Sequence, residues 1–574
     1  MSSNERIDPI LLELIRNTLG SIVDEMAFTI HLTGHSEIIR DAYDLSVAIL
    51  DRKGRMIVQS VNPLQVGSMA VGAKDLLHDL EGDLDPGDVI LTNDPYGGIS
   101  THLPDVFMFK PIFHEGQLIA VTNATGHQTD MGGRVAGSNA SDSTELCQEG
   151  LRLAPLKFLE KGRFNPTLVK IIEKNVRVPD RVLGDLRGLL AACNAGEREF
   201  LKLVNRYGME TLDNVNERLL AYAEQRTADE IATWPAGVYE FTDYLDDDGF
   251  GKGPIPLKCK ITVGGGSLDV DFAGSAPQVR GAINCVIGAT KAATFAAVRT
   301  LLSLDIPDNE GYFRCIRVSA PEGSIVNCLY PAPVAARAMT TYRVAEVVFG
   351  ALAQVLPDRI PAGPEGGNTV VAIGGYQDRK PFVMVDMING NRGGYPDKDG
   401  MEAQNHPTQN MRNTPIERLE ARLPIRIERY GFVTDTGGPG RYRGGAALER
   451  QYRLLSEEAV LQARSDRRVH RPYGLAGGRC GAASVNELDG QLVPTKITEV
   501  MKQGQVFRHQ LAGGGGHGDP ITRETAKVLH DVLEGMVSIE AARRDYGVVI
   551  DPHIMTVDEE STKEVRREMA RSTQ

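Results

Sequence analysis

The chain has few aromatic residues, few cysteines and no long apolar run. Aromatics make up 6% of its 574 residues, with one tryptophan, so stacking platforms for single-stranded nucleic acid are not expected. Its seven cysteines are odd in number and none lie at CxxC spacing, which argues against a disulfide framework or a thiolate zinc site. No apolar run approaches the ~20 residues that span a bilayer, and the N-terminus lacks a signal-peptide core. These absences predict a cytoplasmic protein without a membrane partner.

Basic residues are also outnumbered, and the formal net charge is −13. Nucleic-acid binding normally needs a basic face that neutralises phosphates, so no nucleic-acid partner is expected. The short cluster Arg464, Arg467, Arg468 and Arg471 is interpreted as a solvated or structural patch. Glycine is abundant by contrast: 61 glycines and 30 prolines predict many tight turns and a loop-rich chain with much β-structure.

Changes of pattern along the chain predict a mixed α/β protein with several domains, since a domain usually contains ~100–200 residues. We expect an α/β domain that carries the chemistry over residues 1–165 and a helical segment over 166–235. An α/β middle domain over 236–365 is expected to follow, and then a glycine-rich β domain with a helical tail over 366–574.

Individual elements follow from capping and periodicity. Asp8-Pro9 resembles a helix start, and the apolar residues that follow keep helical spacing up to Gly34. Alternation and hairpin turns predict strands over 45–50, 56–59, 88–92, 107–113, 118–123, 238–244, 257–263 and 267–272. Further helices are expected over 290–304, 342–356, 524–534 and 538–546.

Histidines and carboxylates gather at the ends of the first expected strands. Asp44 precedes one strand, His102 and Asp105 precede another, and His127 follows a third. Rigid scaffolds often present reactive groups at such strand ends. Because His102 and Asp105 are three residues apart, one tight turn can direct both at a single ion. Two imidazoles and two carboxylates suit Zn, Mn or Fe(II) better than Ca or Mg, although each residue alone is also compatible with a structural role.

Two further carboxylates are candidates for catalysis. Asp94 stands in an Asn-Asp-Pro turn, where it could act as a general base or simply cap the turn. Asp130 follows His127 by three residues and could orient it. The loop Gly513–Gly516 lacks the GK[ST] of a P-loop, so it is interpreted as a tight backbone crossing, and no segment resembles an ATPase core.

Several short motifs run in order along nearly the whole chain. They read NDPYGG at 93–98, THLPD at 101–105, QEGLR at 148–152, GDLR at 184–187, PEGS at 321–324, NTPIE at 413–417, GGPGRYRGG at 437–445 and AARRDYGV at 541–548. Together they resemble the hydantoinase B/5-oxoprolinase family. That family includes B-type subunits of hydantoinases, oxoprolinases and lactamases, and the related large subunits of acetone and acetophenone carboxylases.

The resemblance implies a divalent metal in the B-type subunit, zinc first and manganese or iron as alternatives. Its ligands would be the residues at the corresponding positions of this chain, Asp44, His102, Asp105 and His127. The sequence departs from the family pattern at Gln128, where a second histidine is common, and at His517, where an aromatic residue is usual.

The resemblance also implies the reaction and the partner. An A-type subunit would use ATP with Mg to phosphorylate a small cyclic amide, and the present chain would then open the ring of a hydantoin, 5-oxoproline or lactam. The expected assembly is a dimer of heterodimers. Two alternatives stay open: the large subunit of an ATP-dependent ketone carboxylase, and a metal-free scaffold subunit.

Overall fold

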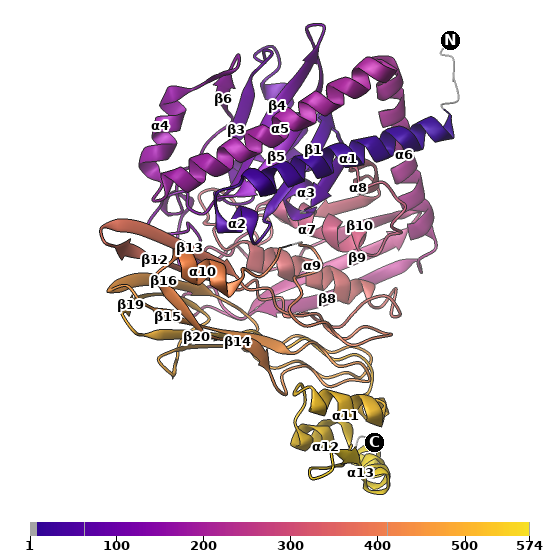
Figure 1. The fold of residues 1–574 in the computed structure, drawn as a ribbon. Coiled ribbons are helices and arrows are strands. Elements are labelled where there is room, and N and C mark those ends of the chain that lie inside the picture. Colours follow the sequence, from indigo (N-terminus) through magenta and orange to yellow (C-terminus); the bar gives the residue numbers. More distant parts are fainter. Residues whose placement is uncertain (1–7, 62, 410, 573–574) are drawn as a thin grey trace.

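The structure is a computed structural model that describes residues 8–61, 63–409 and 411–572 (Figure 1). Its mixed α/β architecture confirms the predicted fold class. The N-terminal part contains a seven-stranded antiparallel sheet in the order β2-β1-β5-β4-β3-β6-β7. Its strands are β1 (Leu45–Asp51), β2 (Met56–Val61), β3 (Val89–Thr92), β4 (Asp105–His114), β5 (Gln117–His127), β6 (Leu156–Glu160) and β7 (Arg163–Phe164).

Both faces of this sheet are covered by helices. On one face pack α1 (Pro9–Thr33) and α5 (Pro179–Tyr207), which cross β1, β4 and β5 (Figure 1). The start of α1 is the one that the sequence predicts, because the Asp8 side chain accepts from the Ile10 N–H and proline occupies the first turn. On the other face packs α3 (Pro63–Asp79). With both faces covered, every residue of β1 is buried.

A layer of helices joins the first sheet to a second one. Helix α3 packs on α7 (Ile287–Arg299), α7 packs on α9 (Ala338–Leu352), and α9 covers the second sheet. One hydrophobic core contains residues from both sheets and all three helices. The structure does not test the predicted domain boundaries at 165, 235 and 365, which stay predictions. The second sheet has the order β11-β10-β9-β8, with β8 (Gly237–Leu245), β9 (Ile255–Gly264), β10 (Ser267–Asp271) and β11 (Ile316–Ser319). Helix α6 (Met209–Ala232) contacts β9 and β10 of this sheet and α8 (Glu310–Phe313) contacts β11, whereas α4 (Pro166–Asn175) packs on α5 beside the first sheet.

Two antiparallel sheets enclose a further core in the C-terminal part. One contains β12 (Val370–Gln377), β13 (Lys380–Met387), β16 (Glu458–Arg464) and β19 (Lys496–Lys502); the other contains β14 (Ile425–Val433), β15 (Ala447–Leu454), β17 (Val485–Leu488), β18 (Gln491–Leu492) and β20 (Val506–Gln510). The helical tail forms a small lobe with its own core, at the bottom of Figure 1. It contains α11 (Thr525–Leu533), α12 (Ile539–Tyr546) and α13 (Glu559–Ser572).

Between the last sheets and the tail, glycine-rich segments run against one another, and this confirms the predicted backbone crossing. The Gly515 N–H donates to the Gly363 carbonyl at 2.8 Å, and the Gly515 carbonyl accepts from the Gly394 N–H at 2.8 Å. A Cβ atom on Gly515 would overlap the carbonyl oxygen of Tyr473. Only glycine therefore allows these segments to approach so closely.

We expect Gly515→Ala to destabilise the chain by about 1–3 kcal/mol, because the added methyl group meets backbone that cannot move aside easily. The matched control is Gly431→Ala, whose added Cβ would have no atom within 4 Å. Thermal unfolding followed by circular dichroism would compare the two variants. Equal midpoints for both would contradict the steric interpretation.

Two predicted absences can be compared with the structure. None of the helices in the described ranges is long and apolar enough to cross a bilayer. All seven cysteines lie within those ranges and are free thiols, whereas an odd count by itself requires only one.

Candidate metal centre

The pairing of three strands brings distant residues to one edge of the first sheet. Strand β5 lies between β1 and β4 and is antiparallel to both, so the start of β1, the end of β5 and the start of β4 coincide. Asp44 immediately precedes β1. Asp105 begins β4 and lies directly opposite His127, the last residue of β5. His102 lies in the turn before β4, which is closed by the Asp105 N–H donating to the His102 carbonyl at 3.2 Å.

His102, Asp105 and His127 form a buried cluster. One ligand atom from each of the three side chains lies within 4.8 Å of the other two, which is close enough for all three to reach one ion. The two imidazole rings are 5.1 Å apart between centroids. Asp44 lines the same cavity, whose free volume of about 30 Å³ has room for an ion or a water molecule. The structure thus brings together all four residues that the sequence singled out as ligands.

The hydrogen bonds of His102 leave its second nitrogen available. Nδ1 lies 3.1 Å from the Ala335 carbonyl, to which it can only donate, so the lone pair is on Nε2. Nε2 lies 3.2 Å from Asp105 Oδ2, but it has no hydrogen-bond partner among the described residues, and neither does Nδ1 of His127. Buried ring nitrogens normally have partners. Two such rings in one cluster with the Asp105 carboxylate fit a divalent cation.

The charge states support the same fit. Burial, assisted by the nearby Arg337, lowers the pKa of His102 to about 4. Burial and the neighbouring His102 lower the pKa of His127 to about 3. Both rings are therefore neutral near pH 7 and carry lone pairs. Burial opposes ionisation of Asp105, but His102 and Arg337 outweigh it, and the pKa of Asp105 lies below its ordinary value.

Two further residues hold the carboxylates in place. Gln65 Nε2 donates to Asp44 Oδ1 at 3.0 Å and to Asp105 Oδ1 at 3.2 Å. Arg337 Nη2 donates to Asp105 Oδ2 at 2.6 Å. Sequence reasoning missed both residues. Gln65 lies on α3, a helix that was not predicted, and Arg337 lies more than 200 residues from Asp105 in the chain with no local motif to mark it.

We expect Gln65→Leu to weaken binding of a divalent metal by about 10–100-fold, since groups that orient metal ligands typically contribute that much. Gln128→Leu is the matched control, because Gln128 is buried nearby and, among the described residues, its side chain donates to the Gly126 carbonyl alone, at 3.2 Å. Competition with a chromophoric chelator would measure both affinities. An unchanged affinity in Gln65→Leu would show that this amide does not support the ligands.

The two candidate catalytic carboxylates make other contacts. Asp94 accepts from the Tyr96 N–H at 2.9 Å and pairs with Arg152 at 2.8 Å. Asp130 is fully buried, accepts from the Gly132 and Gly137 N–H groups, and pairs with Arg177 at 3.0 Å. Neither carboxylate is among the described residues that line the cavity. Their catalytic roles stay predictions, and so does the orienting role of Asp130.

Comparison with known proteins gives a consistent result over nearly the full chain. A family model described as hydantoinase B/oxoprolinase matches residues 8–520. An uncharacterized protein of Methanocaldococcus jannaschii is 35% identical over 98% of this chain and its own full length. A putative B-type subunit of a D-/L-hydantoinase of Pseudomonas sp. is 33% identical over 98% of both chains. The beta subunit of the caprolactamase of Pseudomonas jessenii is 31% identical over 95% of this chain and 97% of its own.

Solved structures extend the comparison. The crystal structure of the ATP-dependent caprolactamase of Pseudomonas jessenii matches with a TM-score of 0.91 and 29% identity, over 98% of this chain and all of its own. A nucleotide-free acetone carboxylase structure also matches with a TM-score of 0.91, over 99% of this chain and 83% of its own. Its identity is 18%, so that likeness concerns the fold alone.

Proposed function

Because the chain belongs to the hydantoinase B/oxoprolinase family, we propose that it is the B-type subunit of an ATP-dependent enzyme that opens a cyclic amide such as a hydantoin, 5-oxoproline or a lactam. The observation that carries the proposal is the buried cluster of His102, Asp105 and His127 beside Asp44. The names of two relatives, a hydantoinase and a caprolactamase, support the substrate class.

In this proposal, Asp44, His102, Asp105 and His127 hold a divalent cation, zinc first and manganese or iron as alternatives. When bound, such a cation lowers the pKa of water and polarises an oxygen of the substrate. The chain itself supplies the positioning. The Ala335 carbonyl keeps the His102 proton on Nδ1, and Gln65 holds the carboxylates of Asp44 and Asp105.

A second subunit is part of the proposal because an unstrained amide is a poor electrophile. We propose that an A-type partner uses ATP with Mg to phosphorylate the amide oxygen, since the present sequence has no P-loop. Water then adds to the activated carbon beside the candidate metal centre. The ring C–N bond breaks and the nitrogen takes up a proton, which leaves an acyl phosphate. A second water molecule hydrolyses the acyl phosphate to a carboxylate and releases phosphate. The hydantoinase and caprolactamase relatives are both named as subunits, which supports a heteromeric assembly.

Co-expression with an A-type subunit and incubation with cyclic amides would test this function. Ring-opened amino acid and ADP are expected only when both subunits, ATP and metal are present. Turnover without ATP would contradict the phosphorylation step. A product that forms only with bicarbonate would indicate a ketone carboxylase, and a stable complex without metal or turnover would indicate a scaffold subunit. Light scattering would test the dimer of heterodimers.

A further inference from the structure

Arg464 is a buried arginine without a carboxylate partner. It ends β16, its relative exposure is 4%, and no described Asp or Glu forms an ion pair with it. Its guanidinium donates only to neutral oxygens, and its Nε has no hydrogen-bond partner among the described residues. Those oxygens are Asn139 Oδ1 at 3.2 Å, the Ala335 carbonyl at 3.1 Å and Asn368 Oδ1 at 3.0 Å. The cluster was interpreted as a solvated or structural patch, and the solvated alternative does not hold for Arg464.

Two other fully buried arginines of this chain have the carboxylate partner that Arg464 lacks. Arg343 pairs with Asp466 at 2.9 Å, and Arg450 pairs with Asp386 at 2.5 Å. A buried charge is costly unless an opposite charge accompanies it. Burial, together with repulsion from Arg337, lowers the pKa of Arg464 to about 9. An anion next to Arg464 would remove this penalty.

The Arg464 guanidinium, which has no carboxylate partner among the described residues, lines the cavity of the candidate metal centre. The Ala335 carbonyl connects the two, because it accepts from Arg464 Nη1 at 3.1 Å and from His102 Nδ1 at 3.1 Å. Arg337, which holds Asp105, lines the same cavity. A ligand beside the metal centre would therefore meet two guanidinium groups. Because the free volume of the cavity is only about 30 Å³, the lining side chains would have to move apart for a phosphoryl group to enter.

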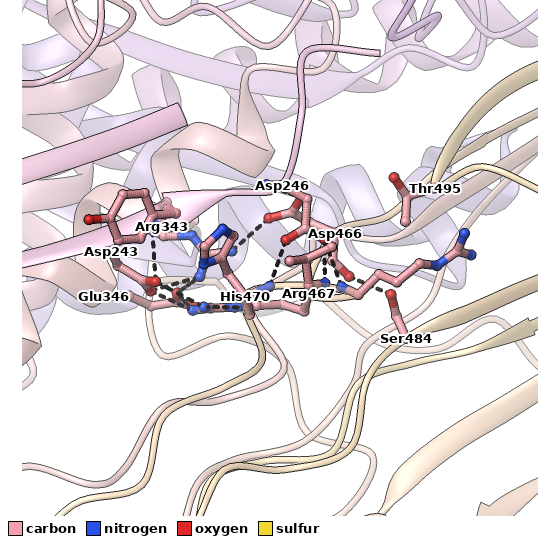
Figure 2. Close-up of polar contacts among 12 residues, drawn as sticks. Asp243, Asp246, Arg343, Glu346, Asp466, Arg467, His470, Ser484 and Thr495 are labelled. Carbon is pink, nitrogen blue, oxygen red and sulfur yellow. Dashed lines mark hydrogen bonds and ion pairs between the residues drawn. The ribbon is translucent and has the colours of Figure 1, made fainter. Parts of the chain in front are cut away.

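The position of Arg464 is held by the residues that follow it. Asp466 pairs with Arg343 at 2.9 Å, and Arg467 pairs with Asp243 at 2.9 Å, within the buried ion network of Figure 2. Both Asp466 and Arg467 are fully buried. Because Asp466 and Arg467 are fixed so close to the end of β16, the backbone at Arg464 is held in place.

The charged residues that line the cavity favour a ligand with two negative charges. The carboxylates of Asp44 and Asp105 balance the guanidinium groups of Arg337 and Arg464 among the charged residues that line the cavity. A divalent cation would add two positive charges to this balance. A phosphate ester dianion would neutralise both charges, whereas a single carboxylate would neutralise only one. Guanidinium groups also match phosphate geometry. We propose that Arg464, together with Arg337, binds the phosphoryl group of a phosphorylated substrate beside the metal centre; its identity as an amide phosphate rests on the proposed function.

Calorimetric titration of inorganic phosphate into the metal-loaded, full-length chain would test this site. We expect phosphate to bind the wild type, and Arg464→Gln to bind it at least about tenfold more weakly because a charge-assisted contact is lost. Arg464→Lys keeps the positive charge but loses the paired N–H donors of the guanidinium group, so an intermediate affinity is expected. The matched control is Arg412→Gln, since Arg412 is exposed and lies over the Tyr43 ring, 5.0 Å from its centroid. Metal content, measured in each variant, should not change.

The outcomes separate the possibilities. No phosphate binding by the wild type, or equal binding by wild type and Arg464→Gln, would overturn the proposal. Acetate that binds as tightly as phosphate and is weakened equally would assign the site to a carboxylate instead. If Arg464→Gln does not fold, Arg464→Lys decides, since wild-type affinity in that variant would also overturn the proposal. The titration needs neither partner nor cyclic amide, so a failed ring-opening assay would not affect its result.

Discussion

Replacing His102 with alanine is expected to remove both bound metal and ring opening. The change deletes one of the buried ring nitrogens that face Asp105 and leaves two residues of the cluster with Asp44. Metal ions contribute several kcal/mol to such reactions, so the loss of turnover should be at least about a thousandfold. Elemental analysis and assay with the ATP-using partner would measure the two effects together.

The control for this change is His114→Ala. His114 ends the same strand β4 at the opposite end from Asp105 and is not among the described residues that line the cavity. It should keep full metal content and activity. Near-stoichiometric zinc in the wild type would favour hydrolysis, whereas manganese would leave carboxylation open. A His102→Ala variant that kept its metal and its turnover would rule out His102 as a ligand.

Replacing Arg343 with methionine is expected to destabilise the chain by about 3–5 kcal/mol, the usual effect of removing one partner from a buried ion cluster. Arg343 is fully buried and pairs with Asp243 at 2.9 Å, Glu346 at 2.8 Å and Asp466 at 2.9 Å. Figure 2 shows these carboxylates converging on the two arginines Arg343 and Arg467. Without Arg343, Asp243 and Glu346 would keep Arg467 as their ion-pair partner, and Asp466 would keep only Lys496 among the described residues.

The same network connects elements that lie far apart in the chain. Asp243 is on β8, Arg343 is on α9, and Asp466 follows β16. Disruption of the network by Arg343→Met should therefore lower the melting midpoint and reduce the yield of folded protein. Arg317→Met is the matched control: its ion pair with Asp269 is largely exposed, and such pairs contribute about 0–1 kcal/mol. Equal midpoints for the two variants would show that the buried network is not required for stability.

Several features could be predicted from sequence because their causes are local. Asp8-Pro9 and the apolar spacing after it are enough to place α1, which begins at Pro9 and ends before Gly34. The alternation around Gly116 predicts β4 and β5, and their ends carry Asp105 and His127. Helix α3 was missed. Its Gly67 and Gly72 weaken a helical signal, and they serve close packing, since a Cβ on Gly67 would lie 2.9 Å from Ala292 Cβ.

The sequence by itself determined the mixed α/β class, the family resemblance and the residue types of the candidate metal centre, because capping, periodicity and motif order are properties of neighbouring residues. Only the tertiary structure decided which partners surround that centre. Antiparallel register sets His127 opposite Asp105, α3 brings Gln65 to both carboxylates, and the end of β16 brings Arg464 into the cavity. Burial raises the free-energy cost of an unpaired charge, and burial depends on contacts between segments hundreds of residues apart. For that reason the sequence left open whether Arg464 belongs to a solvated or a structural patch, whereas in the fold it is a buried cation without a carboxylate beside it.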